Sequence, residues 1–246
     1  MARQKDMGFD APLPLHGERG EDILICGKHF SADPSGALYW PGEKTLIVAD
    51  LHLEKAPAKA GKGRLLPPYD TRSTLRRLAG VMDSYDPDRV IVLGGSLHDE
   101  AAAERMPRAD RKKLSILRQG REWYWVTGIY DPDMPDWLGG IVCPALTIES
   151  IKFRHEPSNG PKTHEVAGHL HPAAQLTCRG ASVRRKCFIS NGARMVIPAF
   201  GVYAGGLNVL DKTFAGLFQN GDFHVWMLGQ KKVYPATKQE LLSDTD

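Results

Sequence analysis

Cysteine pairs and long apolar segments are both missing from this sequence. Its four cysteines include no Cys-x-x-Cys pair, so neither a thiolate zinc site nor a disulfide framework is indicated, and reduced thiols in the cytoplasm fit best. No apolar run approaches the roughly 20 residues that cross a bilayer, and the first residues lack the apolar core of a signal peptide. We therefore expect a cytoplasmic protein without a membrane partner.

A strong excess of one charge is missing as well. Lysine and arginine number 32 against 29 aspartates and glutamates, a net charge of +3, which neither requires nor excludes a polyanionic partner. Internal repeats and low-complexity tracts are also lacking. With 246 residues, the chain is long enough to bury a full core, as one large α/β domain or two small ones.

The first half of the chain alternates apolar runs with helical periodicity. The predicted strands are 21–30, 37–40, the run that ends at Asp50, 89–93 and 122–127, and the predicted helices are 70–85 and 109–119. The stretch from Lys55 to Tyr69 is too irregular for either period, so a loop is expected there. This order of elements predicts a parallel sheet with crossover helices.

After Gly139 the pattern changes to short β runs separated by turns. They are 140–153, 163–168, 173–178, 183–189, 194–200 and 222–234. These runs predict a second, mainly antiparallel sheet, and two sheets face to face with helices outside make an α/β fold with four layers, an α/β/β/α sandwich. We expect an irregular leader at 1–20, this single domain at 21–236, and a polar tail at 237–246.

A carboxylate and an imidazole follow the third predicted strand. The apolar run 45–49 predicts a buried strand with Asp50 at its C-terminal tip, and His52 comes two residues later. Ligands bind at that edge of open α/β sheets, and carboxylate oxygen with imidazole nitrogen suits Mn, Fe, Co or Zn. Alone the motif is weak, because an Asp at a strand end is more often a turn or helix cap.

Three histidines farther along strengthen this interpretation. His155 follows another predicted strand, and His169 and His171 lie in a Gly-His-Leu-His motif. Histidines at positions i and i+2 of an extended segment project to the same side. Together with Asp50 and His52, they favour a metal site over five unrelated structural residues.

Five longer motifs occur in a characteristic order. They are DLHLEKA at 50–56, LLPPYDT at 65–71, HEP at 155–157, GHLHPA at 168–173 and PAFGVYAGGLNV at 198–209. From about residue 20 to 235, the chain resembles the calcineurin-like metallophosphoesterases and, more narrowly, the ligase-associated DNA damage response endonuclease family, PdeM. The resemblance implies the four-layer sandwich, a dinuclear metal centre that commonly holds manganese, and hydrolysis of phosphodiesters, with DNA as the expected substrate.

The resemblance also implies a division of the ligands. By position, Asp50, His52 and His171 would hold one metal, and His155 and His169 the other. Two cations roughly 3.5–4 Å apart can hold both a hydroxide nucleophile and the phosphate oxygens. A repair context, with a DNA ligase and a helicase as partners, is implied by the family alone.

Two motifs depart from the family pattern. Where the family has Gly-Asp-Ser-Phe-His-Asp, whose first Asp bridges both metals, this chain has Gly95 in place of that Asp. Where the family has Gly-Asn-His-Asp, this chain has Ile129 and Tyr130. Ile129 cannot bind a metal, and a phenol, whose ordinary pKa is about 10, is a poor replacement for an imidazole acid. No residue is therefore assigned with certainty as catalytic.

The remaining ligands predict one metal ion or none rather than two. Asp50, His52 and His171 suffice for a mononuclear site, whereas His155 and His169 alone are too few for tight binding. Without a bridging carboxylate, two dications at ~3.5 Å would repel each other by about 19 kcal/mol at an effective dielectric constant of 20. Asp99 or Asp131 could replace the lost ligands only by turning inward, and Tyr130 only by binding as a phenolate. We expect the two aspartates to be structural.

Substrate contacts are predicted on two segments. Lys59, Lys62 and Arg64 follow the Asp50 motif and are placed to reach a nucleic-acid backbone. Asn208 could contact substrate, with a role in a turn as the equal alternative. The basic run from 105 to 121 is by default a solvated face, with a phosphate contact as the alternative.

Two functions of different classes follow from these observations. The first is a hydrolase, a metal-dependent phosphodiesterase or endonuclease associated with DNA repair. The second is a catalytically degenerate homologue that keeps the fold and binds nucleic acid or partner proteins. The family resemblance favours the first, and the replacements at Gly95, Ile129 and Tyr130 favour the second or an impaired enzyme.

Overall fold

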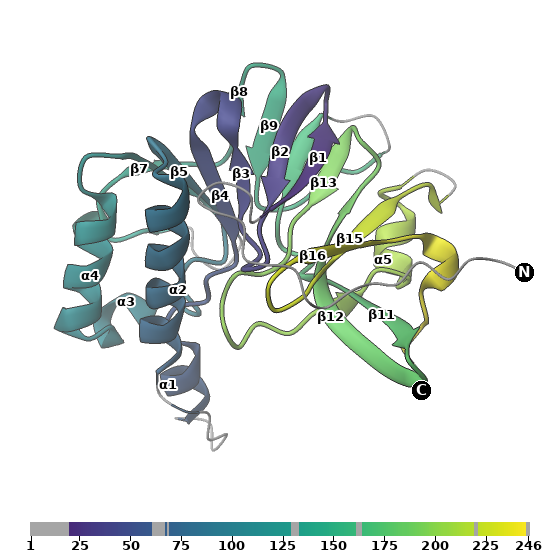
Figure 1. Cartoon of the computed structure of the whole chain (residues 1–246). Coiled ribbons are helices and arrows are strands. Elements are labelled where there is room, and N and C mark those ends of the chain that lie inside the picture. Colours follow the sequence, from purple (N-terminus) through teal and green to yellow (C-terminus); the bar gives the residue numbers. More distant parts are fainter. Residues whose placement is uncertain are drawn as a thin grey trace, which may run out of the picture.

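The computed structural model describes residues 20–60, 67, 69–128, 133–160, 164–218 and 221–244. Over these ranges the chain forms two β-sheets that pack face to face, with helices on the outside (Figure 1). The predicted α/β fold with two stacked sheets is confirmed. The predicted leader lies outside the described residues, apart from Gly20.

The first sheet has an antiparallel half and a parallel half. Its strands follow one another across the sheet in chain order, β1 (Glu21–Ile25), β2 (Lys28–Ala32), β3 (Leu38–Trp40), β4 (Thr45–Ala49), β5 (Arg89–Leu93), β6 (Glu122–Val126) and β7 (Ile141–Cys143). Strands β1 to β4 pair antiparallel, and β4 to β7 pair parallel. All five residues of β4 are buried, as expected of a strand covered on both faces.

Helices cover the outer face of the first sheet. They are α2 (Asp70–Tyr85), α3 (Ala102–Arg105) and α4 (Arg108–Arg118), with the 3-10 turn η2 (Asp136–Leu138). The same half of the chain also contains the short helix α1 (Lys55–Ala60) and the 3-10 turn η1 (Pro41–Glu43). Leu75 and Leu78 of α2 and Leu114 of α4 belong to one apolar cluster with Val48 and Val92 of the sheet. Within the described ranges, no helix combines the length and the apolarity needed to span a bilayer.

The segment from Lys55 to Tyr69 was predicted to be a loop, but it begins with the short helix α1. The backbone N–H of Ala56 in its first turn donates a 2.9 Å hydrogen bond to the carboxylate of Asp70, and Thr71 accepts from the N–H of Glu54. First-turn N–H groups have no partner within a helix. Here the partners come from the start of α2, a contact that the local sequence pattern cannot show.

The second sheet mixes both pairing directions. Its strands are β8 (Leu146–Ile148), β9 (Ile151–Arg154), β10 (Glu165–Ala167), β11 (Pro172–Cys178), β12 (Ala181–Ser190), β13 (Arg194–Val196), β14 (Leu207–Asn208), β15 (His224–Leu228) and β16 (Val233–Ala236). Most of the pairs in the described ranges are antiparallel, as predicted, but β10 lies parallel between β9 and β13. The ends of these parallel strands therefore reach the same edge of the sheet.

Three apolar clusters separate the layers. One lies between α2, α4 and the first sheet, a second between the two sheets, where Ile47 and Ile91 meet Phe153 and Phe188, and a third on the outer face of the second sheet. This last face is covered by a thin layer that includes Phe214 of α5 (Lys212–Ala215). The fourth layer is therefore much slighter than the helical layer opposite (Figure 1).

The described part of the predicted tail packs against the second sheet. The 3-10 turn η4 (Lys238–Glu240) begins with a capping box between Thr237 and Glu240. After it, Leu241 is buried and forms a β-bridge with Leu176 of β11. Residues beyond 236 are thus in contact with the domain, and the domain boundary at this position stays a prediction.

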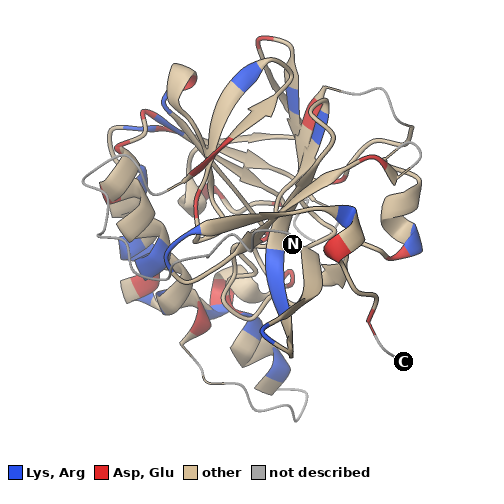
Figure 2. Ribbon diagram, turned by 45° about the vertical axis from the view of Figure 1, so that its right-hand side comes forward, with Lys and Arg blue, Asp and Glu red and all other residues tan. Residues whose placement is uncertain are grey.

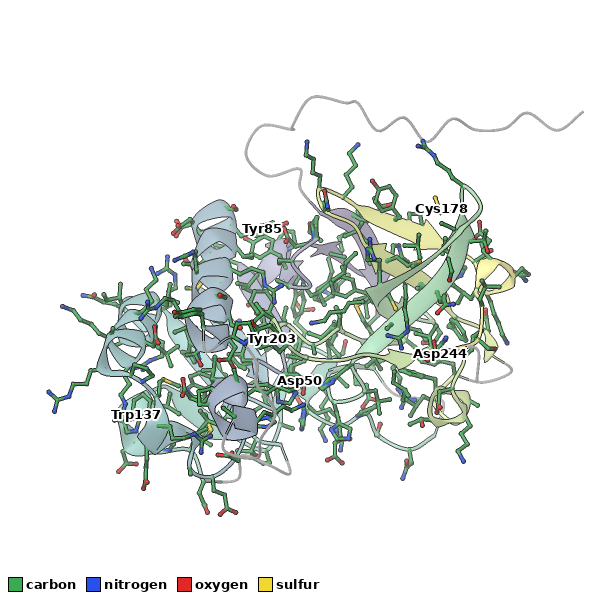
Figure 3. The ribbon with its side chains drawn as sticks, turned by 90° about the horizontal axis from the view of Figure 1, so that it is seen from below. Asp50, Tyr85, Trp137, Cys178, Tyr203 and Asp244 are labelled. Atoms are coloured by element: carbon green, nitrogen blue, oxygen red, sulfur yellow. The ribbon has the colours of Figure 1, made fainter. Side chains whose placement is uncertain are left out.

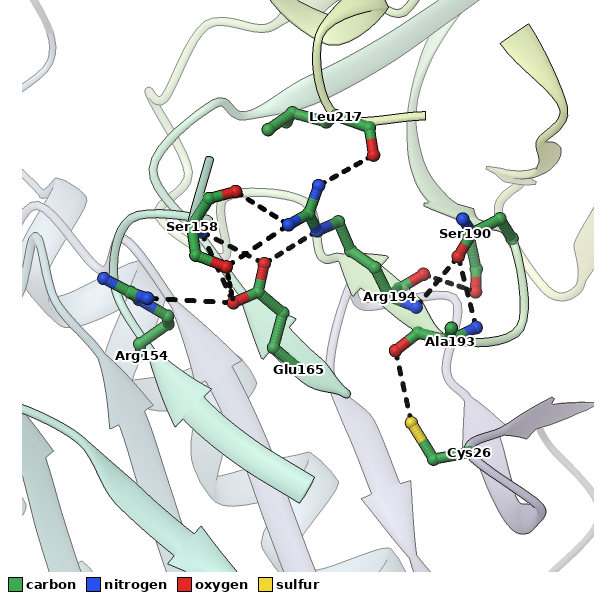
Figure 4. Close-up of polar contacts among 9 residues, drawn as sticks. Cys26, Arg154, Ser158, Glu165, Ser190, Ala193, Arg194 and Leu217 are labelled. Atoms are coloured by element: carbon green, nitrogen blue, oxygen red, sulfur yellow. Dashed lines mark hydrogen bonds and ion pairs between the residues drawn. The ribbon is translucent and has the colours of Figure 1, made fainter. Parts of the chain in front are cut away.

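A buried ion pair fixes the loop that follows β9. Arg194, which is fully buried, donates from Nε to Glu165 at 2.7 Å, from Nη1 to the carbonyl of Leu217, and from Nη2 to the carbonyl of Ser158 (Figure 4). Ser158 also donates its hydroxyl to Glu165. The pair thereby links β10 and β13 to the segment immediately after His155.

We expect Arg194→Met to lower the free energy of unfolding by about 3–5 kcal/mol, because it removes the cation 2.7 Å from the buried carboxylate of Glu165 and leaves only Arg154, at 3.9 Å. Urea denaturation followed by circular dichroism measures this loss. Arg185→Met is the matched control, because Arg185 is exposed and surface substitutions usually change stability by no more than about 0.5 kcal/mol. Equal losses for both variants would contradict this account.

Candidate metal centre

The ends of strands from both sheets meet at one edge of the molecule. Asp50 follows β4, Gly95 follows β5, His155 follows β9, and His169 follows β10. A β-bridge between Ala49 and Ala199 joins the first sheet to the segment after β13. Figure 3 looks at this edge from below. In that view Asp50 lies near the centre, between α1 and α2 on one side and the β11–β12 hairpin on the other.

The backbone at this edge is in an unusual conformation. Four of the predicted ligands have positive φ angles, 52° at Asp50, 45° at His52, 67° at His169 and 48° at His171. The left-handed region costs a non-glycine residue roughly 1–2 kcal/mol, and such residues are concentrated at functional sites. The assumption that His169 and His171 lie on an extended segment was therefore wrong.

Asp50, His52 and His171 form the first cluster. Their candidate ligand atoms all lie within 4.8 Å of one another. His171 Nε2 is 3.2 Å from Asp50 Oδ1 and 3.2 Å from His52 Nε2. Two imidazole nitrogens that face each other at this distance can share a proton or bind a common cation. One carboxylate and two imidazoles are a suitable ligand set for a divalent transition metal.

His155, Glu156 and His169 form a second cluster beside the first. Their candidate ligand atoms also lie within 4.8 Å of one another, and the rings of the two histidines are 4.9 Å apart in an edge-to-face arrangement. Glu156 was not among the predicted ligands. The signal for it was a carboxylate directly after a histidine at a strand end.

The carboxylate of Asp50 connects the two clusters. Its Oδ1 lies 2.9 Å from Nε2 of His155, and its Oδ2 accepts a hydrogen bond from the backbone N–H of His169. The five predicted ligands are thus brought together, with His169 and His171 in different clusters. Their role as ligands stays a prediction.

Electrostatics favour the metal-binding protonation states of Asp50, His52 and His169. Burial acts to raise the pKa of Asp50, but hydrogen bonds from His155 and His171 outweigh it and the net pKa lies below its ordinary value. Burial lowers the pKa of His52 to about 3 and also lowers the pKa of His169. An ionised carboxylate and neutral imidazoles are the protonation states that bind metals.

Gly95 is in close contact with the Asp50 carboxylate. A Cβ built at position 95 would lie 2.5 Å from Asp50 Oδ1, and the φ angle of Gly95 is +54°. Asp50 therefore occupies the space into which a side chain at position 95 would extend. The bridging carboxylate of the family cannot be added here without moving Asp50.

The other predicted site residues are distributed as follows. Lys59 lies half-buried on α1, and Asp99, considered as a substitute ligand, pairs with Arg105 at 2.8 Å. The side-chain amide of Asn208 donates to the carbonyl of Leu242 and to Asp244, which favours the structural alternative. Lys62, Arg64, Ile129, Tyr130 and Asp131 lie outside the described residues.

Comparison with solved structures finds a nuclease. The chain matches the crystal structure of the nuclease MPE from Pseudomonas putida with a TM-score of 0.67 and 25% sequence identity, over 88% of this chain and 100% of the other. A phosphoesterase from E. coli, YfcE, matches at 12% identity over 78% of this chain and 97% of that chain, with a TM-score of only 0.40. No protein-family model and no curated protein matches. The chain thus shares the fold of the calcineurin-like phosphoesterases.

We expect Gly95→Ala to destabilise the protein more than Gly27→Ala. Both glycines have positive φ angles, +54° and +75°, so both variants carry the backbone strain of roughly 1–2 kcal/mol. A Cβ at Gly27 meets nothing within 4 Å, whereas a Cβ at Gly95 displaces Asp50. Thermal unfolding of the two variants compares them directly. Equal losses would show that Asp50 moves without cost.

We also expect the metal-free protein to lose stability as the pH falls below about 6.5. Because the pKa values of His52 and His169 are depressed in the fold, the unfolded chain takes up protons first, and stability rises with pH in this window. Urea denaturation in a chelator at several pH values between about 7.5 and 5 measures the slope. His52→Gln should flatten it, and the exposed His29→Gln should not; no difference between the two would argue against a depressed His52 pKa.

Proposed function

We propose that this protein is a metal-dependent phosphoesterase that cleaves phosphodiester bonds of nucleic acid, with DNA as the expected substrate. The observation that supports it best is the convergence of Asp50, His52 and His171 at the strand ends of a fold shared with a nuclease. Manganese is the expected cation on the basis of the resemblance to the PdeM family. The repair context, the ligase and the helicase stay predictions from that resemblance.

The residues of the first cluster fit the chemistry of such an enzyme. A bound divalent cation would supply Lewis acidity for a phosphoryl oxygen and a water of lowered pKa. Asp50 and the two imidazoles would hold it, and Asp50 is itself fixed by the N–H of His169 and by His155. Ligands that are oriented by other hydrogen bonds bind their metal in a defined geometry.

Basic side chains near this edge fit a polyanionic substrate. Lys55 and Lys59 lie on α1, which begins three residues after His52, and Figure 2 colours Lys and Arg blue. Lys186 on β12 donates to the carbonyls of Ala199 and Gly201, next to the Asp50 strand end. Phosphate backbones are bound mainly by such charges, in a salt-dependent manner.

The second candidate function is a homologue that binds nucleic acid without cleaving it. It is favoured by Gly95, where the family has its bridging carboxylate, and by Ile129 and Tyr130, where the family has Asn and His. Both candidates predict binding of DNA. Only the first predicts hydrolysis that depends on an added divalent cation.

We expect manganese-dependent hydrolysis of bis-p-nitrophenyl phosphate and of DNA that falls by at least about 100-fold in His171→Ala, beyond the range of a residue that merely orients a ligand. The control His29→Ala removes an exposed histidine that pairs with Asp22 and should retain full activity. Activity at background in the original protein, together with retained DNA binding, would favour the second candidate.

A further inference from the structure

The second cluster contains a carboxylate, Glu156, that is not among the metal ligands implied by the family resemblance. We propose that Glu156 completes a second divalent-cation site with His155 and His169, and that Asp50 is shared between the two sites in place of the side chain missing at Gly95. This inference rests on the proposed function. It changes the expected metal content from one ion to two.

The position of Glu156 supports the first part of the proposal. Its Oε1 is buried and has no hydrogen-bond partner among the described residues. One carboxylate oxygen of Glu156 lies within 4.8 Å of the candidate ligand atoms of His155 and His169. A buried carboxylate oxygen without a partner is unfavourable unless a cation or a donor compensates it. Two imidazoles and one carboxylate are a common ligand set for a catalytic divalent metal.

The loop that carries Glu156 is held firmly. Two residues after it, Ser158 donates its hydroxyl to Glu165 at 2.8 Å, and its carbonyl accepts from Arg194 at 2.7 Å (Figure 4). Glu165 and Arg194 are both buried. Glu156 therefore lies between a fixed histidine and a fixed serine, which restricts its carboxylate to the neighbourhood of the second cluster.

The position of Asp50 supports the second part. Its Oδ1 is 2.9 Å from His155 Nε2, in the second cluster, and 3.2 Å from His171 Nε2, in the first. It lies between the clusters because position 95 has no side chain, since a Cβ added there would approach Oδ1 to 2.5 Å. A shared carboxylate and a second carboxylate at 156 restore the negative charge that two nearby dications need.

The experiment measures metal content rather than activity. The full chain is stripped with a chelator, titrated with Mn²⁺ by calorimetry, desalted, and analysed for manganese by mass spectrometry. We expect two ions per chain in the original protein and one in Glu156→Gln, with the affinity of the second site reduced at least tenfold. Glu149→Gln is the matched control, because Glu149 is exposed and pairs with Lys28 away from both clusters.

A conservative variant separates ligation from folding. Glu156→Asp keeps the carboxylate and should bind two ions, with a weakened second site. If circular dichroism shows that Glu156→Gln is unfolded, Glu156→Asp takes its place in the comparison with the original protein. One ion in the original protein, or two in a folded Glu156→Gln, overturns the inference. If either of these results is obtained but His171→Ala still binds one ion fewer than the original protein, the proposed function survives. No Mn²⁺ binding at all would overturn both.

Discussion

The buried carboxylate of Asp50 joins the two sheets at the candidate metal centre. Asp50 follows β4 of the first sheet, and its partners, the imidazole of His155 and the backbone N–H of His169, follow β9 and β10 of the second. Its side chain is 1% exposed. An ionised carboxylate is removed from water only where hydrogen bonds or opposite charges replace its hydration. The two sets of strand ends must therefore meet for this residue to be stable in its position.

The same close packing determines the backbone. The N–H of Asp50 donates to the carbonyl of Gly94, and the N–H of His52 donates to the carbonyl of Gly95. These bonds hold Asp50 and His52 in the left-handed region, which would be unfavourable in an isolated chain. They also bring Gly95 so close to Asp50 that a side chain there has no space. The absence of a side chain at position 95 and the position of the Asp50 carboxylate therefore depend on each other.

This arrangement bears on whether the centre is degenerate. Compared with the family pattern, the chain lacks metal ligands at 95 and 129 and the imidazole acid at 130. The described residues contain a possible gain, because Glu156 lies with two histidines in a cluster of its own. Carboxylates compensate the repulsion between cations whichever segment of the chain supplies them. A different distribution of ligands is therefore a physical alternative to loss of function, and the nuclease-like fold is compatible with both.

The sequence by itself determined the elements with strong local patterns. Apolar runs and helical periodicity located β4, β5, β6, α2 and α4, because the local order of apolar and polar residues determines which side chains can be buried. The spaced histidines identified the candidate ligands through their side-chain chemistry. The tertiary structure decided what depends on distant partners. The first turn of helix α1 donates a hydrogen bond to the carboxylate of Asp70. Strand β10 lies parallel to β9 and β13, and Glu156 lies in one cluster with His169. Asp50 and His155 are separated by 105 residues, and no local pattern encodes how they meet.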